Sequence, residues 1–227
     1  MIALNFKVLS MTKQQDHLEQ LREIRQMMER SSRFLSLSGL SGVMAGVAAL
    51  LGAATVYIYL GRTPLIDGPY LAGVNAADRS IAPLPFFVLI GGLVFVTALT
   101  AGFWFTSRRA RREGQAIWGP LSRRLVINLA IPLASGGIFI LALYRQGLVE
   151  WIAPATLLFY GMALLNASKF TFTDIRYLGL SEIVLGLLAC FLLGYGLEFW
   201  TVGFGLLHII YGTWMWNKYE RTSPKKS

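Results

Sequence analysis

The chain has 227 residues, of which 55% are hydrophobic and only 15% are charged, and its formal net charge is +9. Soluble domains contain about 25% charged residues, so this composition excludes an ordinary soluble protein and indicates a membrane protein. The single cysteine, Cys190, excludes an intramolecular disulfide and any metal site built from several cysteines.

The first predicted element is a cytoplasmic amphipathic arm over residues 1–35, with a helix expected over 16–35. The start of the arm lacks a sustained apolar core, so no cleavable signal peptide is expected, whether the chain begins at Met1 or at Met11. Three roles stay open for the arm: it lies on the inner membrane surface, pairs with a second copy, or packs beneath the transmembrane bundle.

Six apolar segments follow the arm, each close to the roughly 20 residues that a bilayer-spanning helix needs. They cover residues 36–60, 82–106, 125–144, 149–168, 177–195 and 198–216. Because the hydrocarbon holds no water to satisfy backbone groups, each segment is expected to be helical. The sequence therefore predicts an all-α polytopic membrane protein with six transmembrane helices in three hairpins over residues 36–217, followed by a basic tail at 218–227.

The distribution of basic residues orients these helices. Eighteen of the 21 lysines and arginines fall in the arm, the 107–124 loop, the turn between the fourth and fifth segments, and the tail. Only Arg62, Arg79 and Arg145 fall on the opposite side. Cytoplasmic loops carry the excess of basic residues, so both termini of this multi-pass chain are expected in the cytoplasm.

The loop at 107–124 carries six arginines, which raises the question of a nucleic-acid partner. No nucleic-acid-binding motif accompanies them, so no nucleic acid is expected, and the arginines are explained by membrane topology. A contact between this loop and anionic lipid headgroups remains an alternative.

Glycines recur at helical spacing and predict close helix packing. Gly42 and Gly46 form a GxxxG pair on a small-residue stripe of the first segment. Small residues let helix backbones approach closely inside lipid, where no hydrophobic drive brings helices together. The stripe is expected to face protein, either within the bundle, in a homo-oligomer, or against another membrane protein.

Two later segments share one frame, GLSEIVLG at 179–186 and GLLHIIYG at 205–212. In each, two glycines flank an ionisable residue on one helix face, Gly179 and Gly186 around Glu182, and Gly205 and Gly212 around His208. The sequence predicts two smooth faces that can contact each other.

The depths of the two ionisable residues can be compared. Glu182 is six residues beyond Arg176, about 9 Å into the membrane, and His208 is ten residues before Lys218, about 15 Å in. Their helices run antiparallel, so a contact between them is expected. Asn128, Asn166 and Tyr211 are expected to join them in a polar cluster in the inner half of the bundle.

Internal similarity extends beyond this frame. YGMALLN at 160–166 and YGTWMWN at 211–217 keep Tyr-Gly-x-x-x-x-Asn, which suggests an internal repeat. The run at 177–216 resembles the hairpins of HdeD-like acid-resistance membrane proteins, and residues 125–168 resemble them more weakly. That resemblance implies a small six-helix, multi-pass protein of the bacterial inner membrane and brings no catalytic motif with it.

No motif for catalysis, metal binding or a cofactor is present, and two histidines, His17 and His208, cannot provide bis-histidine haem ligation within one bundle. We therefore expect a non-enzymatic membrane protein of accessory, stress-related or sensory type, without cofactor or metal. A Glu182–His208 pair either joins two helices, responds to protons or binds a ligand. A small proton-linked transporter or channel that uses the polar cluster is the alternative function.

Overall fold

A computed structural model of the chain describes residues 37–61, 84–112, 114 and 117–221. Every regular element in these ranges is helical. The predicted arm at 1–35, nearly all of the segment 61–81 between the first two apolar segments, and the end of the basic tail lie outside the described residues.

The helices coincide with the six apolar segments, although the last segment is divided into consecutive pieces. In chain order they are α2 (Gly39–Leu60), α3 (Leu84–Arg112), α4 (Pro120–Arg145), η1 (Val149–Trp151), α5 (Ile152–Ala167), η2 (Ser168–Phe170), α6 (Asp174–Phe191), α7 (Gly196–Trp200), the π-helical η3 (Thr201–Leu207), α8 (His208–Trp216) and the π-helical η4 (Asn217–Arg221).

Four of these helical stretches are long and apolar enough to cross a membrane: Gly39–Leu60, Phe86–Arg112, Pro120–Arg145 and Val149–Phe170. The prediction of an all-helical protein is confirmed for the described residues, and four of its helices could span a membrane. Helix α6 has 18 residues but includes Asp174, Arg176 and Glu182, which lowers its apolar character.

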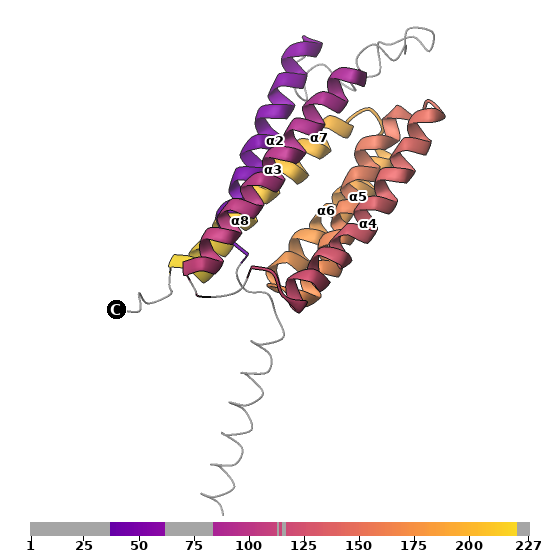
Figure 1. The fold of residues 1–227 in the computed structure, drawn as a ribbon. Helices are drawn as coiled ribbons and strands as arrows, with labels where there is room; N and C mark the ends of the chain where they lie inside the picture. Colours follow the sequence, from indigo (N-terminus) through magenta and orange to yellow (C-terminus); the bar gives the residue numbers. More distant parts are fainter. Residues whose placement is uncertain (1–36, 62–83, 113, 115–116, 222–227) are drawn as a thin grey trace, which may run out of the picture.

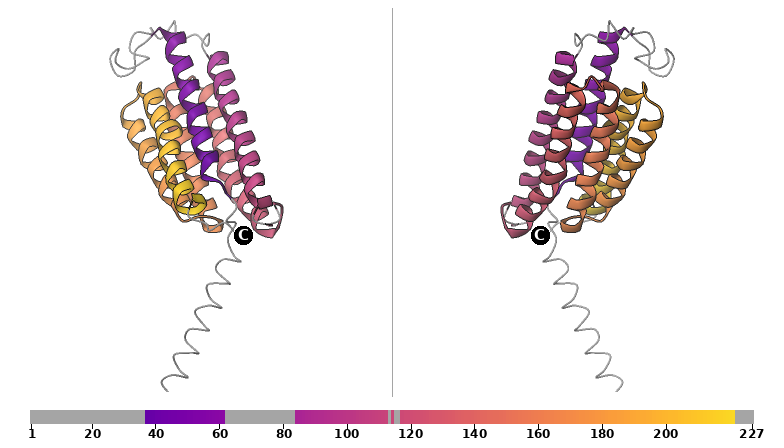
Figure 2. Two further views of the ribbon diagram at one scale, coloured as in Figure 1. Left: turned by 90° about the vertical axis from the view of Figure 1, so that its left-hand side faces the viewer. Right: turned by 90° about the vertical axis from the view of Figure 1, so that its right-hand side faces the viewer.

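The helices form two groups that run side by side along one axis (Figures 1 and 2). The first group, named here the α2 half, consists of α2, α3 and the η3–α8 run, in which α2 packs on both neighbours. The second, the α5 half, consists of α4, α5 and α6, with α5 in the middle. Helix α7 contacts α5 and leads the chain from one half into the other.

The outer surface of the bundle is suited to lipid. Along α3 the exposed side chains are large and apolar, among them Leu89, Val96 and Phe103. Exposed hydroxyls on this surface donate to carbonyls one turn back, as Thr97 does to Leu93 at 2.8 Å. A hydroxyl that bonds to its own helix needs no water, as the hydrocarbon requires.

The glycine stripe of α2 packs on α8 and η3. A Cβ added at Gly46 would lie 2.6 Å from the carbonyl oxygen of Gly205, and one added at Gly42 would lie 3.3 Å from the Cα of Gly212. A Cβ on Gly212 would lie 2.6 Å from the backbone nitrogen of Val43. The stripe therefore lies against backbone within the bundle.

The glycines of α6 pack on α5 instead. A Cβ at Gly179 would lie 2.8 Å from the carbonyl oxygen of Gly161, and one at Gly186 would lie 2.8 Å from the side chain of Leu158. The two glycine frames thus have different partners, whereas the sequence suggested that they could face each other. The reason is spatial: each frame lies on an outer helix of its half and packs on that half's central helix.

At the end of the bundle where α8 finishes, Glu220 holds the start of α2. Its carboxylate accepts a hydrogen bond from the Gly39 backbone N–H at 2.6 Å and from the Ser38 hydroxyl at 3.1 Å. Arg109 at the end of α3 lies 3.5 Å from the same carboxylate. An acidic group at a helix N-terminus satisfies free N–H groups and interacts favourably with the helix dipole.

The same segment also contacts the α5 half. Lys218 and the Tyr219 hydroxyl donate to the carboxylate of Asp174 in the first turn of α6, at 3.0 Å and 2.7 Å. The hydrogen bond to Asp174 raises the pKa of the Lys218 ammonium. The stabilisation that this hydrogen bond gives to the fold is therefore fully present below the pKa of an unfolded-state lysine. It is lost only as the pH rises through the raised pKa of Lys218 in the folded protein. The π-helical η4 thus contacts both halves of the bundle.

Replacing Glu220 with glutamine is expected to lower the free energy of unfolding by about 1–2 kcal/mol, because the charge at the start of α2 and its ion pair are lost. Ser38→Ala, which removes one of the donors, should cost less. Unfolding of both variants in detergent micelles measures the difference. Equal stability of Glu220→Gln and the wild type would contradict this capping role.

Candidate functional site

Three side chains from three helices meet where the two halves join. Glu182 comes from α6, Tyr160 from α5 and His208 from the first position of α8. Nδ1 of His208 lies 3.5 Å from Oε1 of Glu182, and Nε2 of His208 lies 2.7 Å from the Tyr160 hydroxyl. His208 is therefore the link between the α2 half and the α5 half at this level.

Glu182 is the most enclosed ionisable group in the described part of the chain. Its exposed fraction is 0%, against 5% for His208. Within that part, neither carboxyl oxygen has a hydrogen-bond partner. A buried carboxyl group without partners costs several kcal/mol if it is ionised, so its protonation state must depend on the immediate surroundings.

The hydrogen bonds of His208 define its tautomer. Nδ1 lies 3.0 Å from the carbonyl oxygen of Gly203, which can only accept, so Nδ1 carries the hydrogen. In a neutral imidazole Nε2 is then the acceptor, and the Tyr160 hydroxyl donates to it. The geometry therefore fits a neutral ring whose two nitrogens are both satisfied without Glu182.

Gly203 belongs to the π-helical stretch η3, which directly precedes His208. A Cβ added at Gly203 would lie 2.5 Å from Oε2 of Glu182 and 2.6 Å from the side chain of Leu157. The glycine thus leaves the space that the Glu182 carboxyl occupies. π-Helical turns within α-helices often occur at functional sites, where they change the direction of a side chain.

Aromatic rings cover one side of His208. The ring centroid of Phe204 lies 5.9 Å from that of His208 and 4.8 Å from that of Tyr160. Trp200 continues this arrangement, with its centroid 5.1 Å from that of Phe204. The polar groups therefore lie against an apolar wall, which strengthens every electrostatic interaction among them.

Asn128 and Asn166 form a separate polar contact between α4 and α5. Nδ2 of Asn166 donates to the carbonyl and to the side-chain oxygen of Asn128, at 3.1 and 3.2 Å. Lys169 donates to Asn166 at 3.2 Å. These bonds explain the two asparagines as a link between neighbouring helices near the start of α4.

The tyrosine that contacts His208 is Tyr160, whereas the sequence suggested Tyr211. Both tyrosines pack against a buried apolar cluster that includes Leu164 and Met215, and Tyr160 is in addition hydrogen-bonded to His208. Sequence reasoning chose Tyr211 because it is one turn from His208. The sequence does contain a signal for Tyr160: the shared Tyr-Gly-x-x-x-x-Asn pattern makes Tyr160 the equivalent of Tyr211.

Nothing in the described ranges gathers three or more His, Cys, Asp or Glu side chains in a way that could hold a metal ion. Carboxyl, imidazole and phenol groups can each gain or lose a proton, and His208 is hydrogen-bonded to Tyr160 and lies 3.5 Å from Glu182.

The chain matches no protein-family model, no curated protein and no solved structure. The resemblance of residues 177–216 to HdeD-like proteins stays a prediction.

Proposed function

We propose that this chain is a six-helix integral membrane protein of non-enzymatic, sensory or accessory type, with both termini in the cytoplasm. Its core of Glu182, His208 and Tyr160 responds to protonation. The observation that carries the proposal is the Glu182 carboxyl, which is fully enclosed, lacks a hydrogen-bond partner in the described part of the chain and lies 3.5 Å from His208.

The position of the core supports a response that reaches the whole bundle. Adding or removing a proton changes the contact of Glu182, in the α5 half, with His208, in the α2 half. Ionisable groups in a membrane interior are costly, which favours a functional reason for keeping them. A proton at this junction therefore changes how strongly the halves bind each other.

Infrared difference spectroscopy of the protein in lipid nanodiscs tests the first step. Between about pH 5 and 9, we expect a carboxylic-acid C=O band that changes with pH and is absent in Glu182→Gln. Glu150→Gln makes the same chemical change in η1, outside the core, and should keep the band. A wild-type spectrum without such a pH-dependent band would contradict the proposal.

Spin labels test the second step. Ile58 near the end of α2 and Phe191 at the end of α6 are 81% and 86% exposed and belong to different halves. With cysteines at both positions and Cys190→Ala, electron–electron distance measurements should give a distribution that changes with pH, and Glu182→Gln should abolish the change. A distribution that is constant with pH would remove the sensory function.

A second candidate function, a small proton-linked transporter or channel, is favoured by the π-helical stretch Thr201–Leu207 beside His208. Irregular helices at binding sites are a common feature of transporters. Proton flux into vesicles that contain the protein, lost in Glu182→Gln, would favour this function. Flux equal to that of empty vesicles would exclude proton transport.

A further inference from the structure

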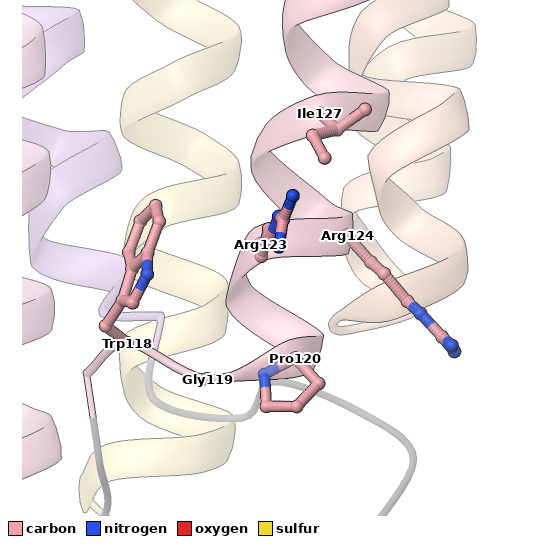
Figure 3. Close-up of a pocket in the computed structure, with 6 residues that line it drawn as sticks. All are labelled: Trp118, Gly119, Pro120, Arg123, Arg124 and Ile127. Carbon is pink, nitrogen blue, oxygen red and sulfur yellow. The ribbon is translucent and has the colours of Figure 1, made fainter.

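A pocket of about 490 Å³ lies beside the first turns of α4, far along the chain from Glu182 and His208 (Figure 3). It is lined by Trp118, Gly119, Pro120, Arg123, Arg124 and Ile127. Its rim is fixed by local geometry, because the Gly119 N–H donates to the Ser122 hydroxyl at 2.8 Å and Pro120 opens the helix. The pocket lies at the end of the bundle where α3 finishes and α4 begins (Figure 1).

Two arginines give the lining of the pocket a positive charge. Arg123 and Arg124 are both exposed, and neither has an ion pair in the ranges that the structure describes. The described carboxylates at this end are already used, since Glu220 binds the start of α2 and Asp174 binds Lys218 and Tyr219. Within the described ranges, no carboxylate at this end is therefore left to pair with these arginines, and the pocket can accept an anionic ligand.

The two arginines do not point the same way. In Figure 3, Arg123 lies on the side of α4 that faces the indole of Trp118, and Arg124 extends to the other side of the helix. Trp118 is exposed, as an aromatic ring at the level of lipid headgroups would be. Arg123 and Trp118 therefore lie on facing sides of the pocket, which Arg124 also lines.

An apolar stripe continues from the pocket along α4. Ile127, Ile131 and Ile138 are all exposed, and their spacing places them on one face of the helix. A small soluble anion would not contact this stripe, whereas the acyl chain of a lipid would cover it. The combination of a basic pocket and an apolar stripe matches a molecule with an anionic head and a hydrocarbon tail.

We propose that this pocket binds the phosphate of an anionic phospholipid from the surrounding leaflet. Arg123 donates to the phosphate oxygens, Trp118 packs at the level of the headgroup, and an acyl chain follows Ile127, Ile131 and Ile138. The planar guanidinium suits two-pronged binding to a phosphate, and an ammonium group provides only a point charge.

Native mass spectrometry of the detergent-solubilised full chain, titrated with phosphatidylglycerol or phosphatidylcholine, tests the site. The wild type should bind phosphatidylglycerol roughly tenfold more tightly than phosphatidylcholine. Arg123→Gln should lose most of this preference, and Arg123→Lys should lose part of it. Arg111→Gln is the matched control, since it removes the same charge from the exposed last turn of α3, outside the pocket.

Three results would overturn the proposal. The first is equal binding of the two lipids by the wild type. The second is an equal loss of preference in Arg123→Gln and Arg111→Gln, which would indicate attraction to net charge only. The third is displacement of the lipid by sn-glycerol 3-phosphate at the same concentration, which would show that the apolar stripe takes no part. Retention of the preference in Arg111→Gln together with its loss in Arg123→Gln supports the site.

Discussion

Replacing Gly212 with leucine is expected to separate α2 from α8 and to lower the free energy of unfolding by about 3 kcal/mol, the upper end of the usual cost of overpacking. Even a methyl group at Gly212 would lie 2.6–3.0 Å from backbone atoms of Val43, Gly39 and Gly42. A side chain can change its rotamer to relieve such a clash, but a helix backbone cannot, so the two helices must move apart.

Gly92→Leu provides the matched control for this prediction. Gly92 lies on α3, and a Cβ added there would meet no atom within 4 Å. The same substitution should therefore be neutral or slightly stabilising, because leucine favours the helix over glycine by up to about 1 kcal/mol. Unfolding of both variants in mixed micelles measures the difference. Equal loss in the two variants would mean that Gly212 does not lie at a tight contact.

Replacing His208 with leucine is expected to lower the free energy of unfolding by about 2 kcal/mol, since two polar groups lose their partner at once. The Tyr160 hydroxyl loses its acceptor, and the carbonyl of Gly203 loses its side-chain donor. A single polar contact between membrane helices is worth only about 0.6 kcal/mol on average. The larger cost comes from leaving the hydroxyl buried and unsatisfied.

The double variant Tyr160→Phe/His208→Leu tests this explanation. It removes the hydroxyl together with its acceptor, so it should be no less stable than His208→Leu alone. Unfolding measurements on the wild type, both single variants and the double variant form a complete thermodynamic cycle. Strictly additive costs would show that Tyr160 and His208 do not interact.

The apolar segments were predictable because the membrane requires long helices. Helices α2 and α5 begin and end within three residues of the expected ranges, whereas α3 ends six residues later and α4 begins five residues earlier than expected. The depths of Glu182 and His208, counted from flanking basic residues, led to the expectation of a contact, and in the structure the two side chains lie 3.5 Å apart. The rise per residue fixes how deep a residue lies along its helix axis, and this depth can be counted from the sequence.

Helix rotation and the choice of neighbours were not predictable in this way. Gly179 and Gly205 occupy equivalent places in their frames, but one packs on α5 and the other on α2. A smooth face shows that a helix can approach another closely and does not specify which one. For the same reason Tyr160, on a different helix, was missed as the partner of His208. The internal repeat and the number of spans beyond four stay predictions.

The contact of α2 with the last helix has a consequence for how the protein is made. The backbone N–H of Gly39 and its partner Glu220 are 181 residues apart in the sequence. The glycine stripe of α2 likewise packs on η3 and α8, which are the last helices to be synthesised among these. A ribosome therefore delivers α2 and α3 to the bilayer long before α8 exists, while α4, α5 and α6 can assemble as they emerge. The α2 half is thus completed only after residues 201–220 have been made, and until then the growing chain keeps an uncovered glycine face on α2.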